Sequence, residues 1–406
     1  MSPRAGASRI AAADVEMPAA ATLIDDLAAR LAARRDDGLE RQRRIVDSAQ
    51  GARVVVDGRE VLAFASNDYL GLANDPAVVA AARDGAARWG AGTGASHLIC
   101  GHQSPHAALE HELADFVRPC AGAGALTFAN GYLANLAIVT ALADRETDVF
   151  ADRLNHACLN DGALLSRGRM VRYAHGDVAA LATRLSTSRA RRKLIATDAV
   201  FSMDGDAAPL AELLALADAH DAWLVVDDAH GFGVLGDGRG TVAEAGLASE
   251  RLVYMGTLGK AAGVAGAFVA AHPAVIATLV QTARPYIYST AAPALLACAL
   301  RASLALIRDD GARRARLHAR IAQFRAGATA LPFTLLPSRT AIQPLVVGDS
   351  TTALTLADAL WERGLWVPAI RPPTVPMGTA RLRVSLSAAH SEDDVECLLA
   401  ALRELR

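Results

Sequence analysis

Short apolar runs alternate with helical stretches along the middle of the chain, and this alternation limits the possible folds more than any other feature. From about Asn67 onward, runs of strand length are separated by helical patterns such as Leu210–His220. The strand candidates are Asp148–Ala151, Lys193–Thr197, Trp223–Val226 and Leu252–Met255. Buried strands connected by helices predict an α/β fold with a mainly parallel sheet and helices on both faces. Ligands bind such sheets beyond the carboxyl ends of the strands.

The pattern changes after Pro293. A long helix over about Pro293–Ala326 is followed by strand-like Ile342–Val347, a helix near Thr352–Arg363 and strand-like Leu382–Ser387. This mixture predicts a smaller α+β domain packed on the large one. A chain of 406 residues is also too long for one ordinary core.

Two elements precede the alternating region. Leu23–Arg44 is charge-rich and amphipathic and predicts a helix, and Arg53–Phe64 alternates like a pair of strands around the turn Asp57-Gly58. We therefore expect three parts, namely an N-terminal arm and helix over residues 1–65, a large domain over residues 66–290 and a C-terminal domain over residues 291–406.

Composition argues against several classes of protein. A formal net charge of −2 gives no reason to expect nucleic acid or an anionic membrane as a partner. The five cysteines are widely spaced and form no Cys-x-x-Cys pair, so neither a disulfide framework nor a metal site is expected. Residues 1–21 lack the apolar core of a signal peptide, and the apolar runs are too short to span a bilayer. We expect a cytoplasmic protein.

Two clusters at strand ends carry groups suited to catalysis. The run Trp223–Val226 ends in Asp227-Asp228-Ala-His230, where a carboxylate could keep a heterocyclic nitrogen protonated. A strand-end turn capped by aspartate is an equally common reading. Lys260 lies among Gly and Ala in Thr257-Leu-Gly-Lys260, where a lysine can have a lowered pKa and attack a carbonyl. Most lysines, however, are simply exposed.

Three further segments become informative only in combination. Asn130-Gly131-Tyr132 opens an apolar helix, and free N–H groups at a helix start attract phosphate, although an ordinary turn fits as well. His156 alone is more often a hydrogen-bonded structural residue than a catalyst. The turn Phe201–Asp206, which contains Ser202, is likewise ordinary by itself.

The order of these segments resembles that of fold-type-I pyridoxal-phosphate enzymes and, more narrowly, of the α-oxoamine synthases. The resemblance runs from about Leu27 to the C-terminus. Its signatures are Ser66–Gly71 (SNDYLG), Phe201–Asp206 (FSMDGD), Asp227–Gly231 (DDAHG) and Gly256–Lys260 (GTLGK). The resemblance implies the fold of a fold-type-I transferase, with a large cofactor-binding domain and a smaller C-terminal domain, and pyridoxal 5′-phosphate as cofactor.

The same resemblance implies the roles of four catalytic residues. Lys260 would form the Schiff base with the cofactor, and Asp227 would pair with the pyridine nitrogen. His230 would contact the phenolic oxygen of the ring. His156 would stack on the ring face, assist proton handling and contact substrate.

Further cofactor contacts are implied at six other positions. Gly131 and Tyr132 would contribute backbone N–H groups, and Ser202 and Thr257 would contact the cofactor. Ser289 and Thr290 match a segment that reaches the phosphate of the partner subunit, which implies a homodimer. Alternatively, these two hydroxyls start the long helix after Pro293.

Substrate contacts are implied at three positions. Arg383 would hold the carboxylate of an amino acid, while Arg41 and Thr374 would contact substrate. The neighbouring Arg43 and Arg44 permit a shifted register for Arg41. The segment Gly92–His97 departs from the Gly/Ser-rich version typical of the family, which leaves the role of His97 open.

Within the family, Ala369–Pro376 and Gly378–Arg383 look most like members that join L-alanine to a pimeloyl thioester in biotin biosynthesis. That reaction releases carbon dioxide and a free thiol, and the thiol could belong to coenzyme A or to acyl carrier protein. Glycine C-acetyltransferase, 5-aminolevulinate synthase and aminotransferases use related chemistry and are alternatives. A binding protein with a decayed cofactor site is disfavoured, because Lys260, Asp227, His230 and His156 are all present.

Overall fold

The computed structural model describes residues 22–41 and 43–405, so the expectation for residues 1–21 lies outside the described part. The chain divides into two compact units, residues 1–44 and 45–406. In the described part of the first unit, α1 (Leu23–Asp36) begins with a capping box formed by Thr22 and Asp25, and all its residues are at least partly exposed. The helix expected to reach Arg44 ends earlier, because Gly38 adopts a left-handed φ of +65° just beyond it.

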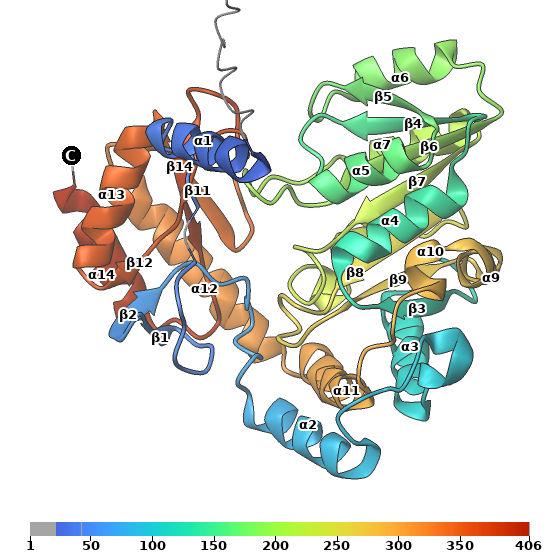
Figure 1. Ribbon diagram of the computed structural model, residues 1–406, viewed down its shortest axis with the longest axis horizontal. Helices are drawn as coiled ribbons and strands as arrows, with labels where there is room; N and C mark the ends of the chain where they lie inside the picture. Colours follow the sequence, from blue (N-terminus) through green and yellow to red (C-terminus); the bar gives the residue numbers. More distant parts are fainter. Residues whose placement is uncertain (1–21, 42, 406) are drawn as a thin grey trace, which may run out of the picture. The chain divides into compact units, whose positions relative to one another are not determined.

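The second unit contains a seven-stranded sheet, in the right-hand part of Figure 1, with strand order β3-β9-β8-β7-β6-β4-β5. The strands β8, β7, β6, β4 and β5 are parallel, and β9 is antiparallel to both of its neighbours. The mainly parallel sheet is therefore confirmed. The bounds are β3 (Gly124–Phe128), β4 (Thr147–Asp152), β5 (Arg169–Tyr173), β6 (Arg192–Asp198), β7 (Ala222–Asp227), β8 (Leu252–Thr257) and β9 (Ala267–Ala271).

Alternate side chains of the central strands supply two separate cores. In β7, Leu224 and Val226 belong to one hydrophobic cluster and Val225 to the other, as expected for a strand buried on both faces. The first core includes α3 (Ser104–Val117), α6 (Val178–Thr187) and α7 (Leu210–Ala219). The second includes α4 (Gly131–Leu142), α5 (Ala157–Leu165) and α9 (Pro273–Thr282). Helices thus cover both faces of the sheet.

The C-terminal region contains a second, four-stranded sheet with order β10-β11-β14-β13. Its elements are β10 (Thr334–Leu335), β11 (Ile342–Gly348), α13 (Ser350–Glu362), β13 (Ala369–Ile370), β14 (Ala380–Ser385) and α14 (Glu392–Glu404). The long helix expected after Pro293 is in fact two helices, α11 (Ala294–Asp309) and α12 (Gly311–Ala328). The break lies at Asp310, whose side chain caps α12 by accepting a hydrogen bond from the backbone N–H of Arg313.

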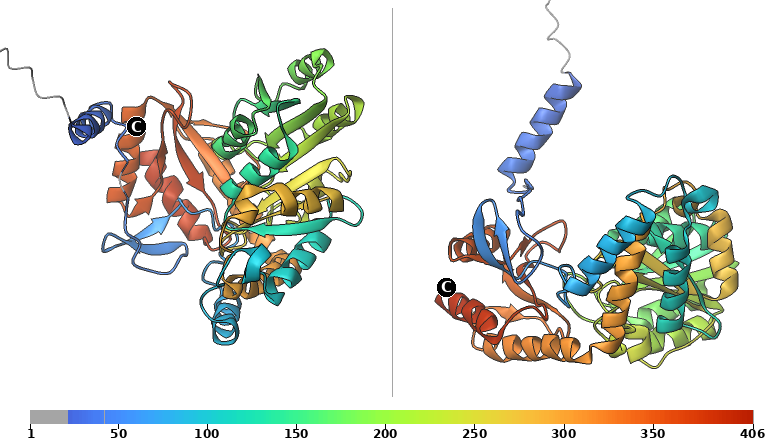
Figure 2. Two further views of the ribbon diagram at one scale, coloured as in Figure 1. Left: turned by 45° about the vertical axis from the view of Figure 1, so that its right-hand side comes forward. Right: turned by 90° about the horizontal axis from the view of Figure 1, so that it is seen from below.

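Smaller elements complete the second unit. The expected hairpin is present as β1 (Arg53–Val56) and β2 (Arg59–Ala63), and β12 (Leu365–Trp366) pairs with β2. In the right-hand view of Figure 2, α2 (Pro76–Trp89) runs beside α11. Gly85 permits this approach, because a Cβ there would lie 3.0 Å from the Cα of Leu295. The other elements are a π-helical turn (His97–Gly101), a 3₁₀ turn (Gly236–Gly238), α8 (Thr241–Glu244) and α10 (Arg284–Ile287).

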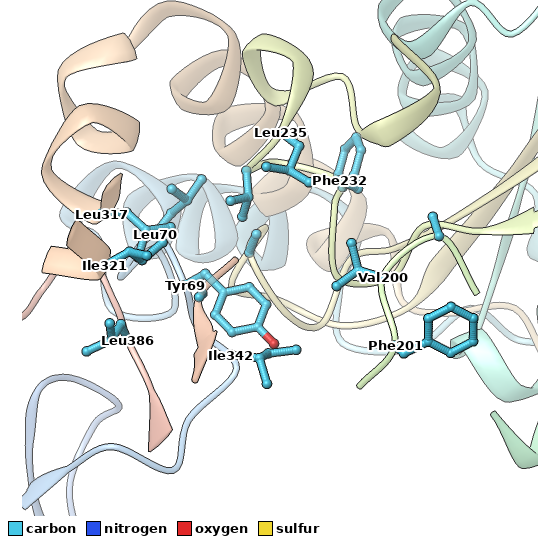
Figure 3. Close-up of a cluster of buried hydrophobic side chains, with 14 of the residues drawn as sticks. Tyr69, Leu70, Val200, Phe201, Phe232, Leu235, Leu317, Ile321, Ile342 and Leu386 are labelled. Atoms are coloured by element: carbon cyan, nitrogen blue, oxygen red, sulfur yellow. The ribbon is translucent and has the colours of Figure 1, made fainter. Parts of the chain in front are cut away.

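Buried side chains from distant segments meet beside the signature Ser66–Gly71. Figure 3 shows Tyr69 and Leu70 near Leu317 and Ile321 of α12 and Ile342 of β11, within the first core. Val200 and Phe201, just after β6, belong to the same cluster. This packing fixes the segments that carry the candidate site. The expected division of the unit at residues 66 and 291 stays a prediction. In the described residues, no helix is long and apolar enough to cross a bilayer.

Candidate active site

The carboxyl ends of four parallel strands carry the polar residues of the candidate site. Asp152, Asp198, Asp227 and Thr257 are the last residues of β4, β6, β7 and β8, and Asp198 pairs in register with Asp227. The strands are buried up to these ends, so the sequence places polar groups where the hydrophobic core stops. As expected for a parallel sheet, this edge is where the site lies.

Lys260 and His230 are in direct contact. The Lys260 Nζ lies 2.9 Å from the Nε2 of His230, and the His230 Nδ1 lies 2.7 Å from the Tyr69 hydroxyl. Burial lowers the pKa of Lys260 to about 8, although Asp227 and Asp198 oppose the shift. Burial and the nearby cations Lys260 and Arg383 also lower the pKa of His230 well below its ordinary value. The site thus holds a neutral imidazole beside an amine that is partly neutral near pH 7.

The direction of the hydrogen bonds follows from Asn67. Its Oδ1 only accepts, so the Tyr69 hydroxyl donates to it over 3.0 Å. Tyr69 then accepts from Nδ1–H of His230, which leaves the Nε2 lone pair of His230 facing Lys260. Neither Tyr69 nor Asn67 was given a role from the sequence, although both lie in the signature SNDYLG.

Arg383 contacts Asn67, at the end of this hydrogen-bonded series that lies farthest from Lys260. Its guanidinium donates to the Ser202 carbonyl at 2.7 Å and to Asn67 Oδ1 at 3.3 Å, and only 5% of the residue is exposed. Among the residues that the structure describes, no carboxylate lies within ion-pair distance of it. Buried cations are normally paired with an anion. Arg383 is therefore well suited to an anionic ligand, as expected for a residue that holds a carboxylate.

Asp227 and Asp228 face different surroundings although they are adjacent. Asp227 accepts from Asn135 Nδ2 at 2.6 Å and from the Ala229 N–H at 3.0 Å, on the side of the sheet edge that holds the site. Asp228 instead accepts from the backbone and hydroxyl of Thr241 and is fully buried. Burial raises the pKa of Asp228 to about 7. The geometry favours Asp227 as the carboxylate that acts on a ligand.

His156 is held at the start of α5. Its backbone N–H donates to Asp198 Oδ2 at 2.6 Å, and its ring is the N-cap of the helix. Burial lowers the pKa of His156, and burial together with Asp227 raises the pKa of Asp198 well above its ordinary value. Sequence reasoning did not single out Asp198. Its signal was present, since it follows a buried strand just as Asp227 does.

The start of α4 offers the expected backbone N–H groups. Asn130 caps the helix by accepting from the Leu133 N–H at 2.9 Å, while the N–H groups of Gly131 and Tyr132 have no partner within the helix. A Cβ at Gly131 would meet only the end of the Met255 side chain, with the methyl group at 3.6 Å and the sulfur at 3.9 Å, so the approach to these N–H groups is open. The Tyr132 side chain is 42% exposed and its hydroxyl donates to Asp161.

The loop that contains Ser202 is anchored at several points. Arg381 binds Asp204 at 2.6 Å, and His175 binds both Asp206, at 2.8 Å, and Asp152, at 3.1 Å. Thr257, at the end of β8, is 9% exposed and donates to the Gly266 carbonyl at 3.2 Å. Ser202 and Thr257 therefore lie on rigid backbone, and their cofactor contacts stay predictions.

We predict that the ion pairs of His175 make stability depend on pH. Hydrogen bonds to Asp152 and Asp206 raise its pKa from 6.5 to about 10, so their contribution is complete below about pH 6.5 and is lost as the pH rises toward 10. His175→Gln should lower the free energy of unfolding by about 1–2 kcal/mol near pH 6 and by much less near pH 10. This value is discounted for solvent screening, because the His175 side chain is 30% exposed.

Urea unfolding of cofactor-free wild type and variant at both pH values measures this difference. An equal loss of stability at the two pH values would contradict the charge argument. It would instead assign the effect to packing of the imidazole against Phe201, whose ring centroid lies 4.4 Å away.

The remaining predicted residues lie in other parts of the structure. Ser289 is partly buried and Thr290 is exposed, and Thr290 pairs with Ser96 in an isolated β-bridge. Neither side chain caps α11, whose N-cap is Pro293, so the alternative that they start this helix is not favoured. Thr374 is exposed in the loop before β14. Arg41 is exposed in the first compact unit, and its substrate contact stays a prediction.

His97, whose role was open, lies in a cluster of rings. It stacks on Tyr286 at 5.0 Å and lies 2.9 Å from His102 between the two Nδ1 atoms. Burial, with His106 and His102 nearby, lowers the pKa of His97 to about 4. The cluster packs beside the segment of Thr290, because His106 donates to the Ala292 carbonyl at 2.8 Å.

These groups fit pyridoxal phosphate. Asp227 is a buried carboxylate with no lysine or arginine within ion-pair distance in the described chain, as a protonated ring nitrogen requires. Lys260 has the lowered pKa of an amine that attacks an aldehyde. The open N–H groups at Gly131 and Tyr132 suit a phosphate.

Comparison with known families and relatives is consistent with this reading. The family described as aminotransferase class I and II matches residues 59–402. A curated relative from Aromatoleum aromaticum, named 8-amino-7-oxononanoate synthase, is 59% identical over 384 residues and covers 94% of this chain and 99% of its own. A relative of the same name from Polaromonas naphthalenivorans is 58% identical over 398 residues, covering 94% of this chain and 97% of its own.

Solved structures are similar as well. A serine palmitoyltransferase from Sphingomonas wittichii has a TM-score of 0.88 at 30% identity and covers 94% of this chain and 96% of its own. An 8-amino-7-oxononanoate synthase from Francisella tularensis has a TM-score of 0.73 at 30% identity, covering 85% of this chain and 97% of its own. Among the similar structures is also a serine palmitoyltransferase solved with PLP, with a TM-score of 0.88.

Proposed function

We propose that this chain, which belongs to the aminotransferase class I and II family, is a pyridoxal-phosphate-dependent acyltransferase of biotin biosynthesis. Its substrates are L-alanine and a pimeloyl thioester, and its products are 8-amino-7-oxononanoate, carbon dioxide and a free thiol. The observation that carries this proposal is the identity of 59% to a curated 8-amino-7-oxononanoate synthase along 94% of the chain.

Serine palmitoyltransferase is the second candidate, because its structures match with a TM-score of 0.88. The sequence identity is 30% there, against 55–59% for the curated 8-amino-7-oxononanoate synthases. Overall backbone similarity reports the shared fold, whereas substrate choice depends on the side chains of the site. The pimeloyl thioester is therefore favoured over a long, uncharged acyl chain.

Lys260 and Arg383 act on different groups of the amino acid, Lys260 on the α-proton and Arg383 on the carboxylate. When bound, pyridoxal phosphate supplies an aldehyde that condenses with primary amines and a ring that accepts electron density from the α-carbon. Lys260, with its pKa lowered to about 8, is neutral often enough near pH 7 to remove the α-proton of alanine and to return a proton to product. Arg383 binds the alanine carboxylate until it leaves as carbon dioxide.

The other residues position these groups and exclude water. Asp227 would hold a positive charge on the ring nitrogen, and His230 would accept a hydrogen bond from the phenolic hydroxyl at Nε2, the atom that contacts Lys260 in the structure. His156 would cover the ring face. The new carbon–carbon bond joins the α-carbon of alanine to the thioester carbonyl carbon, and the thiol departs. Because buried segments surround the site, water is largely excluded and the charges of the site interact in a low dielectric.

A homodimer in the cytoplasm is part of the proposal. Thr290 is exposed next to Tyr288, which is 70% exposed, and the neighbouring π-helical turn exposes 48% of Leu98 and 78% of Ile99. Exposed apolar residues of this kind mark an interaction surface. A second copy that covers them would place the Ser289-Thr290 hydroxyls at the phosphate in the partner's site.

A substrate panel tests the proposed function. Purified holoenzyme is incubated with alanine, glycine or serine, each combined with pimeloyl, acetyl, succinyl or palmitoyl thioesters of coenzyme A, and with pimeloyl-acyl carrier protein. Free thiol and the amino-ketone product are measured. We expect turnover with alanine and a pimeloyl thioester only. Preference for serine with palmitoyl, or for glycine with a short acyl group, would replace this proposal with another activity of the family.

We predict that Asp227→Asn retains the cofactor but lowers turnover roughly 100-fold or more, as expected when a preorganised charge is removed from a site. A neutral amide cannot keep the ring nitrogen protonated. Asp228→Asn is the matched control. Its carboxyl has a pKa of about 7 and is therefore partly uncharged at neutral pH, so an amide replaces it with a small effect. A crippled Asp228→Asn beside a mild Asp227→Asn would reverse the assignment of the two carboxylates.

A further inference from the structure

Two residues outside the predicted site join Asp227 to His156. The Asn135 Nδ2 lies 2.6 Å from Asp227 Oδ2 and 3.0 Å from the sulfur of Cys158. The same sulfur lies 2.8 Å from the Nδ1 of His156. Asn135 is fully buried on α4, and 1% of Cys158 is exposed on α5. The four side chains therefore form one continuous chain of contacts between two catalytic groups.

The direction of each contact can be assigned. Asn135 Nδ2 is a donor, so Asp227 and the sulfur both accept from it. The sulfur must then donate its hydrogen elsewhere. Burial raises the pKa of Cys158 to about 12, so the thiol keeps its hydrogen, and the neighbouring His156 has a lowered pKa and is neutral. The S–H group therefore donates to the Nδ1 of His156.

An independent contact supports this direction. The backbone N–H of Cys158 also points to the Nδ1 of His156, at 3.3 Å, because the His156 ring caps α5. A backbone N–H can only donate, so this longer contact also favours Nδ1 as an acceptor, although less strongly than the 2.8 Å contact of the thiol. The proton of the neutral ring then resides on Nε2.

The orientation of the Asn135 amide is fixed as well. Its Oδ1 is buried and has no hydrogen-bond partner in the described residues. Rotating the amide by half a turn would place this oxygen against the carboxylate of Asp227, which would be repulsive. Asn135 therefore keeps Nδ2 on Asp227, even though one buried oxygen remains unpaired.

We propose that Asn135 and Cys158 are positioning residues, which orient Asp227 and fix the proton of His156 on Nε2. Asn135 donates a hydrogen bond to the Asp227 carboxylate and fixes its orientation at one end of the chain of contacts. Cys158 at the other end makes His156 a donor through Nε2 and prevents it from donating through Nδ1. This inference deepens the proposed function, because His156 and Asp227 are the groups that contact the cofactor there.

The tautomer of His156 can be measured without turnover. Protein labelled with ¹⁵N-histidine is studied by NMR without cofactor, well above the ordinary histidine pKa of about 6.5, and the His156 signals are assigned with His156→Asn. We expect one tautomer, with the proton on Nε2, in wild type. Cys158→Ser retains an O–H donor and should keep that tautomer. Cys158→Ala and Cys158→Val leave only the longer backbone contact and should give a mixture of the two tautomers.

Cys120→Ala is the matched control, since Cys120 is also buried, with 3% exposed, and makes none of these contacts. It should leave the His156 signals unchanged. An unchanged tautomer in both Cys158→Ala and Cys158→Val, with normal melting temperatures, would overturn the role of Cys158. Cys158→Val is included because it fills the space that alanine leaves open.

A second measurement addresses Asn135. Asn135→Leu retains the volume but removes the donor to Asp227, and equilibrium dialysis should show pyridoxal phosphate bound at least about tenfold more weakly, the cost of one charge-assisted hydrogen bond. Unchanged binding would overturn the role of Asn135. Neither readout depends on which substrates react. If the substrate panel showed no turnover of alanine with a pimeloyl thioester while the tautomer and dialysis results were as expected, the positioning roles would be supported and the proposed substrates would be wrong.

Discussion

Lys260→Ala is expected to abolish both turnover and covalent attachment of pyridoxal phosphate, while the fold is retained. Lys260 is the amine that contacts His230 and has its pKa lowered to about 8, so its removal eliminates the nucleophile and the base together. The side chain takes part in no ion pair among the described residues, and its loss should leave the melting temperature of the apoprotein nearly unchanged. Borohydride reduction of the holoenzyme followed by mass spectrometry measures the attachment, and the substrate panel measures turnover.

The sequence provides a sharp control for this experiment. The chain has two lysines, Lys193 and Lys260. Lys193 donates to the His220 carbonyl at 3.0 Å near the start of β6, at the opposite end of that strand from Asp198. Lys193→Ala should therefore keep the reduced adduct and the activity. An adduct that remains in Lys260→Ala, or disappears in Lys193→Ala, would contradict the assignment.

Much of the site could be predicted because it lies where buried strands stop. The strands that end at Asp227 and Thr257 are apolar and short, and the residues after them are therefore fixed at one edge of a parallel sheet. Lys260 and His230 follow these strands by three residues each, so local sequence alone limits their position. The strands β3, β5 and β9 were missed. β3 and β5 are the two edge strands of the sheet, and β9 is short and pairs antiparallel with β3 and β8.

Other parts of the site depend on contacts between distant segments. Tyr69 reaches His230, and Asn67 meets Arg383, across separations of 161 and 316 residues. No local pattern predicts such pairs. Asn135 could have been noticed as a polar residue on the apolar face of α4, but only the fold shows that Asp227 is its partner. The break between α11 and α12 had a local signal in Asp310-Gly311, which a continuous apolar pattern concealed.

Two inactive variants should restore activity when mixed, if each site uses residues of both subunits. Lys260→Ala damages the part of a site that its own chain supplies, and Thr290→Glu places a negative charge where the partner's phosphate would lie. In a mixed dimer, one site combines both defects and the other combines intact parts. Random reassembly makes half of the dimers mixed with one intact site each, so about one quarter of the wild-type activity should return. Each variant is unfolded and refolded alone and together, and turnover is measured.

The control for complementation pairs two defects on the same side of the site. Lys260→Ala and Asp227→Asn both damage groups that one chain contributes, so each site of their mixed dimer contains one of the two lesions and no activity should return. Thr290 is exposed and does not cap α11, so Thr290→Glu is expected to fold and to reduce cofactor affinity rather than stability. Recovery in the control mixture would indicate exchange of material other than subunits. A monomer with full activity, or no recovery with Thr290→Glu, would show that each chain builds its site alone.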